Sequence, residues 1–213
     1  MLSGGYGDDY LDGGEGHDEI EAGWGDDTVK GGAGDDTIDG YYGEDEIHGG
    51  AGDDEITAGY GEDDVYGDEG DDWIYGGNGD DDLWGGKGDD LILGGRYGTD
   101  VVRGGEGDDI LLGGVYTSGA GFSGANYNGW IYGDEGDDAL FGAGYNYNSF
   151  LWGGEGDDYL SGGWYTSGTT KLNGNDGDDF IRRGAYGEET IVKGGKGDDT
   201  VGKVWYDEDT GDF

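Results

Sequence analysis

The chain has 213 residues, with 52 acidic residues against 10 lysines and arginines, so its formal net charge at pH 7 is −42. This charge excludes the binding of nucleic acid phosphates, and the absence of cysteine excludes disulfide bonds and thiol chemistry. A chain so acidic, with 57 glycines, is expected to be disordered unless a pattern organises it.

Such a pattern runs from Gly4 to Leu93, as ten consecutive nonapeptides of the form G-G-x-G-x-D-x-U-x with U aliphatic. Residues 31–39 (GGAGDDTID) are a clean copy. One aliphatic residue in nine forms a core only if successive copies stack their U residues into a ladder. Glycine supplies positive-φ turns between strands that are too short to be stable alone. In the same phase, the U position is then filled by Ile47, Ile56, Val65, Ile74, Leu83 and Ile92.

These nonapeptides resemble the RTX family of secreted calcium-binding proteins. The resemblance implies an all-β, right-handed parallel β-roll with two nonapeptides per coil and about eleven coils in this chain. We expect a single domain over residues 1–213. Within it, 4–93 are regular repeats, 94–202 are repeats with one expanded edge, and 203–213 are a C-terminal cap or tail.

An aspartate stands at the sixth motif position in fifteen of the repeats. Stacking would place these carboxylates about 4.8 Å apart along each edge of the roll, where they repel one another unless a cation lies between them. They are Asp9, Asp18, Asp27, Asp36, Asp45, Asp54, Asp63, Asp72, Asp81, Asp90, Asp109, Asp138, Asp158, Asp179 and Asp199.

Calcium is the cation that fits, because it accepts six to eight oxygens from carboxylates and carbonyls with loose geometry. Zinc is disfavoured, since the chain has only His17 and His48 besides its carboxylates. The resemblance implies that the sixth-position aspartates and loop carbonyls enclose multiple calcium ions. Fifth-position acids such as Asp35 and Asp53 are expected to point outward.

Calcium is therefore expected to drive folding, because without it the carboxylates repel and the glycines keep their conformational entropy. The resemblance implies export from a calcium-poor cytoplasm to a calcium-rich exterior, so we expect a secreted or cell-surface protein. No signal peptide and no membrane-spanning segment is recognised in the sequence, and the export route stays open.

Past Leu93 alternate repeats keep the motif, whereas the repeats between them are longer. We call the two sides of the roll the regular edge and the expanded edge. The expanded repeats that begin at Gly113, Gly142 and Gly162 contain no acid, so we expect calcium to be absent there. The insertions either carry recognition or only seal the side of the roll. The apolar position continues through them at Ile131, Leu151, Leu172 and Ile191.

Aromatic residues recur once per coil on the expanded edge. Two interpretations stay open: a structural stack of rings, and a platform for an extended polysaccharide. A YTSG segment that occurs twice, at 116–119 and 165–168, adds Tyr165 to this surface. The aromatic row consists of Tyr6, Trp24, Tyr42 and Tyr60, continued by Tyr97, Tyr116, Tyr145, Trp164, Tyr186 and Trp205.

On the regular strands the outward neighbours of U are polar at first and then apolar. This predicts an apolar patch that either the insert at 113–129 or another chain covers. A homodimer is the simplest partner, and end-to-end association through open strand edges is an alternative. The patch consists of Trp73, Tyr75, Leu91, Leu93, Ile110, Leu112, Ala139, Phe141 and Tyr159.

An enzyme is not expected. No Ser-His-Asp arrangement is suggested, and the G-x-G-x-x-G match at 119–124 lacks a strand-to-helix context. We predict a secreted calcium-binding structural or adhesive module that presents the aromatic edge and the apolar face to partners. A carbohydrate-binding module is the alternative, ahead of an ice-binding surface or a filament subunit.

Overall fold

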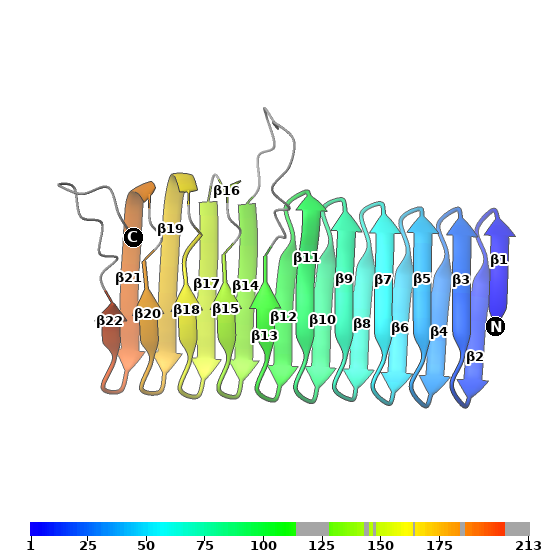
Figure 1. The fold of residues 1–213 in the computed structure, drawn as a ribbon, viewed down its shortest axis with the longest axis horizontal. Coiled ribbons are helices and arrows are strands. Elements are labelled where there is room, and N and C mark those ends of the chain that lie inside the picture. Colours follow the sequence, from blue (N-terminus) through cyan, green and yellow to red (C-terminus); the bar gives the residue numbers. More distant parts are fainter. Residues whose placement is uncertain (114–127, 143–144, 147, 164, 184–185, 203–213) are drawn as a thin grey trace, which may run out of the picture.

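The computed structural model describes residues 1–113, 128–142, 145–146, 148–163, 165–183 and 186–202. All regular structure in these residues is β-strand, and every strand pair is parallel (Figure 1). The strands form two sheets of eleven strands each. In the described residues there is no helix, and hence no helical candidate for a membrane span.

The first sheet contains β1 (Leu2–Tyr6), β3 (Glu19–Trp24), β5 (Thr37–Tyr42), β7 (Glu55–Tyr60), β9 (Trp73–Asn78), β11 (Leu91–Tyr97), β13 (Ile110–Leu112), β15 (Ala139–Phe141), β18 (Tyr159–Ser161), β20 (Phe180–Arg182) and β22 (Thr200–Gly202). The second sheet contains β2 (Tyr10–Glu15), β4 (Thr28–Ala33), β6 (Glu46–Ala51), β8 (Asp64–Glu69), β10 (Asp82–Lys87), β12 (Val101–Glu106), β14 (Asn128–Glu135), β16 (Tyr145–Asn146), β17 (Asn148–Glu155), β19 (Tyr165–Asp176) and β21 (Tyr186–Lys196).

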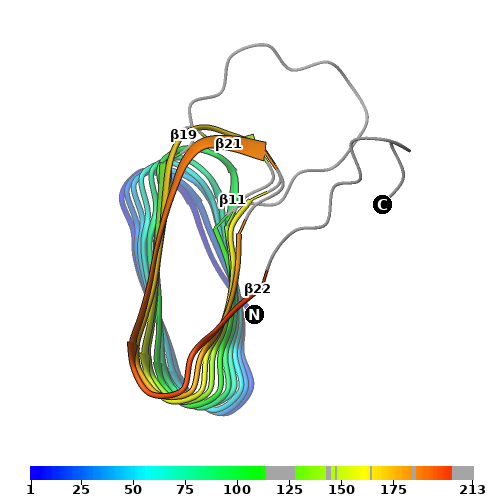
Figure 2. The same cartoon turned by 90° about the vertical axis from the view of Figure 1, so that its left-hand side faces the viewer.

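Successive nonapeptides alternate between the two sheets, and each strand pairs with the strand one coil away. In the regular half the partner is 18 residues away, as in the pairs Glu19↔Thr37 and Ile20↔Ile38. Viewed end-on, the two sheets face each other as the long sides of a flattened coil (Figure 2). The predicted all-β parallel β-roll with two nonapeptides per coil is confirmed.

The core is the predicted ladder of aliphatic U residues, to which Ala22 and Ala58 add. Their side chains alternate with outward neighbours along each strand, so a three-residue segment contributes one core residue. Those of both sheets are 0–1% exposed through most of the roll: Ile20, Val29, Ile38, Ile47, Ile56, Val65, Ile74, Leu83, Ile92, Val102, Leu111, Ile131, Leu140, Leu151, Leu160, Leu172 and Ile181.

One core assignment was wrong. The strand register pairs Leu172 with Val192, and Val192 packs against the core, whereas Ile191 is 36% exposed. Val192, not Ile191, stands two residues before the next repeat at Gly194. Because side chains alternate between the faces of a strand, this slip of one residue moves the core position to the other face.

Glycine is needed where the chain turns at the edges. Gly32 and Gly34 have φ of 119° and 113°, and a Cβ on Gly32 would overlap the carbonyl oxygen of Gly14 in the preceding coil. Positive φ and close backbone approach therefore both exclude larger residues here. The described non-glycine residues that nevertheless adopt positive φ are Tyr41, Asp68, Asp134 and Asn175.

Candidate metal sites along the two edges

The sixth-position aspartates lie in the turns that join the two sheets. On the expanded edge, at the top of Figure 1, turns lead from the first sheet to the second and contain Asp9, Asp27 and their equivalents. On the regular edge, turns lead back and contain Asp18, Asp36 and their equivalents. The topology therefore arranges the predicted residues in two columns, one along each edge.

These side chains are turned into the roll and not out to solvent. Twelve of the fifteen are at most 2% exposed, and only Asp9, Asp18 and Asp199, in the end coils, are partly exposed. Successive members are linked through the main chain: the Asp27 N–H donates to Oδ1 of Asp45 at 2.8 Å, and the Asp36 N–H donates to Oδ1 of Asp54 at 2.7 Å. Each column is thus a continuous series of coil-to-coil hydrogen bonds.

The second carboxylate oxygen has no hydrogen-bond partner. Leaving one buried polar atom unsatisfied costs about 1–3 kcal/mol, and more when it is charged. A cation bound beside each of these oxygens would remove this repeated cost. The affected Oδ2 atoms belong to Asp9, Asp27, Asp36, Asp45, Asp54, Asp63, Asp72, Asp81, Asp90, Asp109, Asp138, Asp158 and Asp179.

The surroundings of these oxygens fit calcium. A Cβ built on Gly76 would lie 2.5 Å from the carbonyl oxygen of Gly94 and 2.6 Å from Oδ2 of Asp81, so both oxygens border one small space that glycine leaves open. In the described residues no three Asp, Glu or His side chains converge on one point. Main-chain carbonyls would therefore have to complete the coordination, which suits an oxygen-seeking cation with loose geometry.

Burial raises the pKa of the twelve sixth-position aspartates that are at most 2% exposed. It raises the pKa of Asp45, Asp54 and Asp72 to about 7, although the main-chain hydrogen bond to each carboxylate opposes the shift and neighbouring aspartates add to it. Burial is also the main reason that the pKa of Asp81 rises to about 8. Without a cation, these groups carry a good share of protons at neutral pH.

Asp100 belongs to the expanded-edge column and was missed in the sequence. It is 4% exposed, its Oδ1 accepts the Asp81 N–H at 3.3 Å, and burial raises its pKa to about 7. A one-residue insertion, seen as a register shift between Gly95 and Tyr97, hides it from a strict nine-residue count. Asp100 stands two residues before the core residue Val102, as every other member stands before its own core residue, and this spacing was the available signal.

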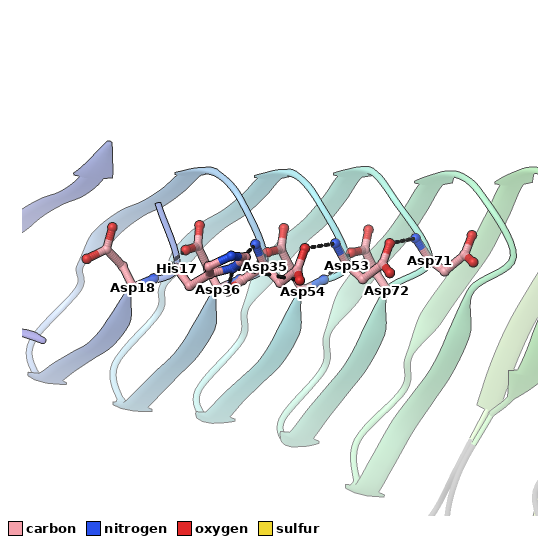
Figure 3. A network of polar contacts seen from close by, with 8 residues as sticks. All are labelled: His17, Asp18, Asp35, Asp36, Asp53, Asp54, Asp71 and Asp72. Atoms are coloured by element: carbon pink, nitrogen blue, oxygen red, sulfur yellow. Dashed lines mark hydrogen bonds and ion pairs between the residues drawn. The ribbon is translucent and has the colours of Figure 1, made fainter. Parts of the chain in front are cut away.

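The fifth-position acids are exposed, as predicted, and they also form hydrogen bonds. Oδ1 of Asp35 accepts the Asp53 N–H at 3.2 Å, and Oδ1 of Asp53 accepts the Asp71 N–H at 3.0 Å. Figure 3 shows this column beside the sixth-position column on the regular edge, with His17 in the fifth position of its coil. His17 replaces a carboxylate as the acceptor in this column, since its Nδ1 accepts the Asp35 N–H at 2.8 Å.

The aromatic row of the expanded edge is a stack of rings. Centroid distances are 6.0 Å for Tyr6–Trp24, 4.4 Å for Trp24–Tyr42 and 4.9 Å for Tyr42–Tyr60. The row continues to Tyr97 through Asn78, which pairs with both Tyr60 and Tyr97.

Further along, the register aligns Tyr165 with Tyr145 and with Tyr186. The predictions at Tyr116, Trp164 and Trp205 lie outside the described residues.

The predicted apolar residues of the first sheet form two adjacent columns on its outer face. Trp73, Leu91, Ile110, Ala139 and Tyr159 are successive partners in one column. Tyr75, Leu93, Leu112 and Phe141 are partners in the other. Phe180 extends the patch, with its ring 5.5 Å from that of Tyr159. Most of these side chains are half-buried by their neighbours, and Ile110 is 47% exposed.

The outer face of the second sheet carries a further ladder that sequence reasoning missed. His48 stacks on Tyr66 and Tyr66 on Trp84, both at 4.6 Å. Arg103 pairs in register with Trp84 and lies over the ring of Tyr132 at 4.3 Å, and Tyr132 stacks on Trp152 at 4.7 Å. The outward residue that follows U on these strands was the available signal.

Comparison with known families agrees with this geometry. The model of the RTX calcium-binding nonapeptide repeat matches residues 1–29, 21–56, 39–74, 57–92, 94–115, 123–144, 143–164 and 165–185. No curated protein matches the chain.

Proposed function

The chain belongs to the family of RTX calcium-binding nonapeptide repeats, and on this basis we propose that it is a secreted structural module that folds when calcium binds its edges. The observation that carries the proposal is the pair of columns of buried aspartates whose Oδ2 atoms lack a partner. We assign the calcium ligands to the fifteen predicted aspartates and Asp100, together with main-chain carbonyls.

Metal binding would supply stabilisation that the chain otherwise lacks. The roll has no disulfide, a core of one aliphatic residue per strand, and a net charge of −42. Cations between the coils would remove the repulsion within each column and satisfy the Oδ2 atoms, so that binding free energy becomes folding free energy. RTX repeat proteins are structural calcium-binding proteins that are typically secreted, which supports a non-enzymatic role outside the cytoplasm.

The matched pair Asp72→Asn and Asp71→Asn tests the assignment. Both residues lie in one turn of the regular edge and each accepts a main-chain N–H through Oδ1, but Asp72 is 2% exposed with an orphaned Oδ2, whereas Asp71 is exposed. We expect Asp72→Asn to raise by several-fold the calcium concentration at the folding midpoint, measured by circular dichroism. Asp71→Asn should change it by less than twofold, and equal effects of the two variants would contradict the assignment.

We also propose that the apolar columns of the first sheet form a partner surface, the simplest partner being a second copy. The two columns carry no charged residue between β9 and β18, while the outer positions of β3 include Glu19 and Glu21. Uncharged apolar area of this kind favours association.

Sedimentation velocity in calcium tests the partner surface with Phe141→Lys against Thr57→Lys, since both positions lie in one column of the face. Concentration-dependent association that Phe141→Lys abolishes and Thr57→Lys preserves is the expected result. Growth without limit would instead indicate end-to-end assembly, and a monomer at all concentrations would reject self-association.

A carbohydrate platform on the aromatic edge is the second candidate. Sugars bind aromatic faces, but the faces of Trp24 and Tyr42 already lie against neighbouring rings at 4.4 and 4.9 Å. This geometry favours the structural stack. Retention on polysaccharide columns that Trp24→Ala abolishes, without a change in calcium-dependent folding, would reverse that preference.

A further inference from the structure

The expanded edge continues past Asp100 with the same main-chain pattern but different side chains. In regular coils the residue after each sixth-position aspartate donates its N–H to the aspartate carbonyl one coil back, as Thr28 donates to Asp9 at 2.9 Å. Trp130 donates to the carbonyl of Asp100 at 3.0 Å in the same way. Gly129 therefore occupies the sixth position of the next coil.

The strand register then identifies the rest of the column. Gly129 pairs with Ser149, Ser149 with Thr170, and Thr170 with Thr190. Ser149 and Thr170 are each 1% exposed, as deeply buried as the aspartates they follow. Two hydroxyl side chains thus stand inside the roll at positions where earlier coils hold a carboxylate.

The Ser149 hydroxyl also takes the place of the carboxylate oxygen. A Cβ built on Gly40, the first residue of a regular repeat, would lie 2.7 Å from Oδ2 of Asp45. A Cβ on Gly142, the first residue of the expanded repeat, would lie 3.1 Å from Oγ of Ser149. The space next to the first glycine is therefore bordered by a neutral oxygen instead of a charged one.

The fifth position changes in the same manner. Oδ1 of Asn148 accepts the Thr169 N–H at 2.9 Å, just as Oδ1 of Asp8 accepts the Asp26 N–H at 3.1 Å earlier on this edge. The coil-to-coil hydrogen bond is kept while the charge is removed. The strands grow as well: β17 has 8 residues and β19 has 12, where β4 and β6 have 6.

We infer that from β14 onward the expanded edge is a metal-independent edge, in which Gly129, Ser149 and Thr170 replace the calcium-binding aspartates and hydrogen-bonded strand extension replaces the metal turn. Calcium would then occupy the regular edge throughout, and the expanded edge only as far as Asp100. A column of neutral side chains has no mutual repulsion to relieve, so this edge needs no cation between its coils, whereas the regular edge of the same coils still does. The inference rests on the proposed function, because it needs the aspartates to be calcium ligands.

Restoring the carboxylates tests the inference. We expect the double variant Ser149→Asp/Thr170→Asp to bind at least one more calcium ion per chain than the wild type, counted by equilibrium dialysis. The isosteric control Ser149→Asn/Thr170→Asn should bind the same number as the wild type. An unchanged count in a folded aspartate variant would overturn the inference.

The variant Ser149→Ala/Thr170→Ala covers the case in which the aspartate variant does not fold. The inference expects its calcium count to equal that of the wild type, because the hydroxyls are not ligands. A lower count would show that Ser149 and Thr170 bind calcium and would overturn the inference. A wild type that binds no calcium would instead refute the proposed function, so the two failures are distinguishable.

Discussion

At the scale of single residues, each sixth-position aspartate divides its two oxygens between two tasks. Oδ1 of Asp54 accepts the Asp36 N–H at 2.7 Å, and Oδ2 remains without a partner in the buried turn. The first oxygen aligns the coils and the second is available to a cation. Loss of the carboxylate charge would therefore affect metal binding more than alignment.

The pH dependence of the metal-free roll follows from these aspartates. Their pKa in the fold is raised from 3.8 to about 7 for Asp54 and Asp90, so the protonated form is favoured by folding. The contribution of these groups to the stability of the metal-free fold is then fully present below about pH 4 and is lost as the pH rises through about 7. In chelator, we expect the β-sheet circular dichroism signal at pH 5 to exceed that at pH 8. A larger signal at pH 8 would contradict this.

Strain at Tyr41 gives a second prediction at this scale. Tyr41 has φ of 69°, and its partners in the column, Gly23 and Gly59, have φ of 120°. A left-handed conformation costs a non-glycine residue roughly 1–2 kcal/mol. Tyr41→Gly should therefore raise the melting temperature in saturating calcium. As the control, Gly59→Ala should lower it, because its Cβ would lie 2.5 Å from the carbonyl oxygen of Tyr41.

At the scale of strands, the outer faces are stabilised by ladders of rings. Tyr66 stacks on His48 and on Trp84, both at 4.6 Å with interplanar angles of 8° and 4°. Each such pair contributes roughly 0.5–1.5 kcal/mol beyond its buried area. Because the ring faces are covered by neighbouring rings, the ladder acts as a brace between coils.

Removing Tyr66 breaks two of these pairs at once. We expect Tyr66→Ala to lower the free energy of unfolding in calcium by roughly 1–3 kcal/mol. Tyr10→Ala is the matched control, because Tyr10 is 62% exposed on the same sheet and its ring has Lys30 at 6.0 Å. Equal losses in thermal unfolding for the two variants would show that the stack adds nothing.

The strands also show why some features were predictable and others were not. The nine-residue period made both the U ladder and the two aspartate columns predictable. Because two repeats form one coil, residues 18 positions apart lie side by side in adjacent coils. Asp100 escaped because an insertion breaks the count, while its spacing to Val102 is intact. Ser149 and Thr170 were missed because they are not acidic, although they stand two residues before the core residues Leu151 and Leu172, and strand pairing confirms that they continue the column of Asp100.

At the scale of the whole molecule, a cation that folds the chain must both neutralise its negative charge and fit the buried turns. Screening by monovalent salt weakens repulsion between exposed charges but does not fill the buried turns. Magnesium requires a tight octahedron and gives up water reluctantly, whereas the turns offer carbonyl and carboxylate oxygens on a flexible glycine backbone.

We therefore expect millimolar calcium to convert an expanded, slowly sedimenting chain into a compact one, whereas equal magnesium should leave it expanded. Sedimentation velocity with each cation and with chelator is the measurement. A control in sodium chloride of the same ionic strength separates screening from binding. Compaction by magnesium at the same concentration as calcium would refute calcium selectivity, and a compact chain in chelator would refute metal-dependent folding.

The hydrogen bonds between coils run in both directions. At the sixth position the Asp36 N–H donates forward to Asp54, and at the fifth position the Asp53 N–H donates backward to Asp35. Each coil therefore depends on both of its neighbours, as in a one-dimensional chain with nearest-neighbour coupling. An ion that orders one coil thus prepares the binding site of the next. The consequence is a steep, sigmoidal calcium response, which should become shallower as coils are removed from the roll.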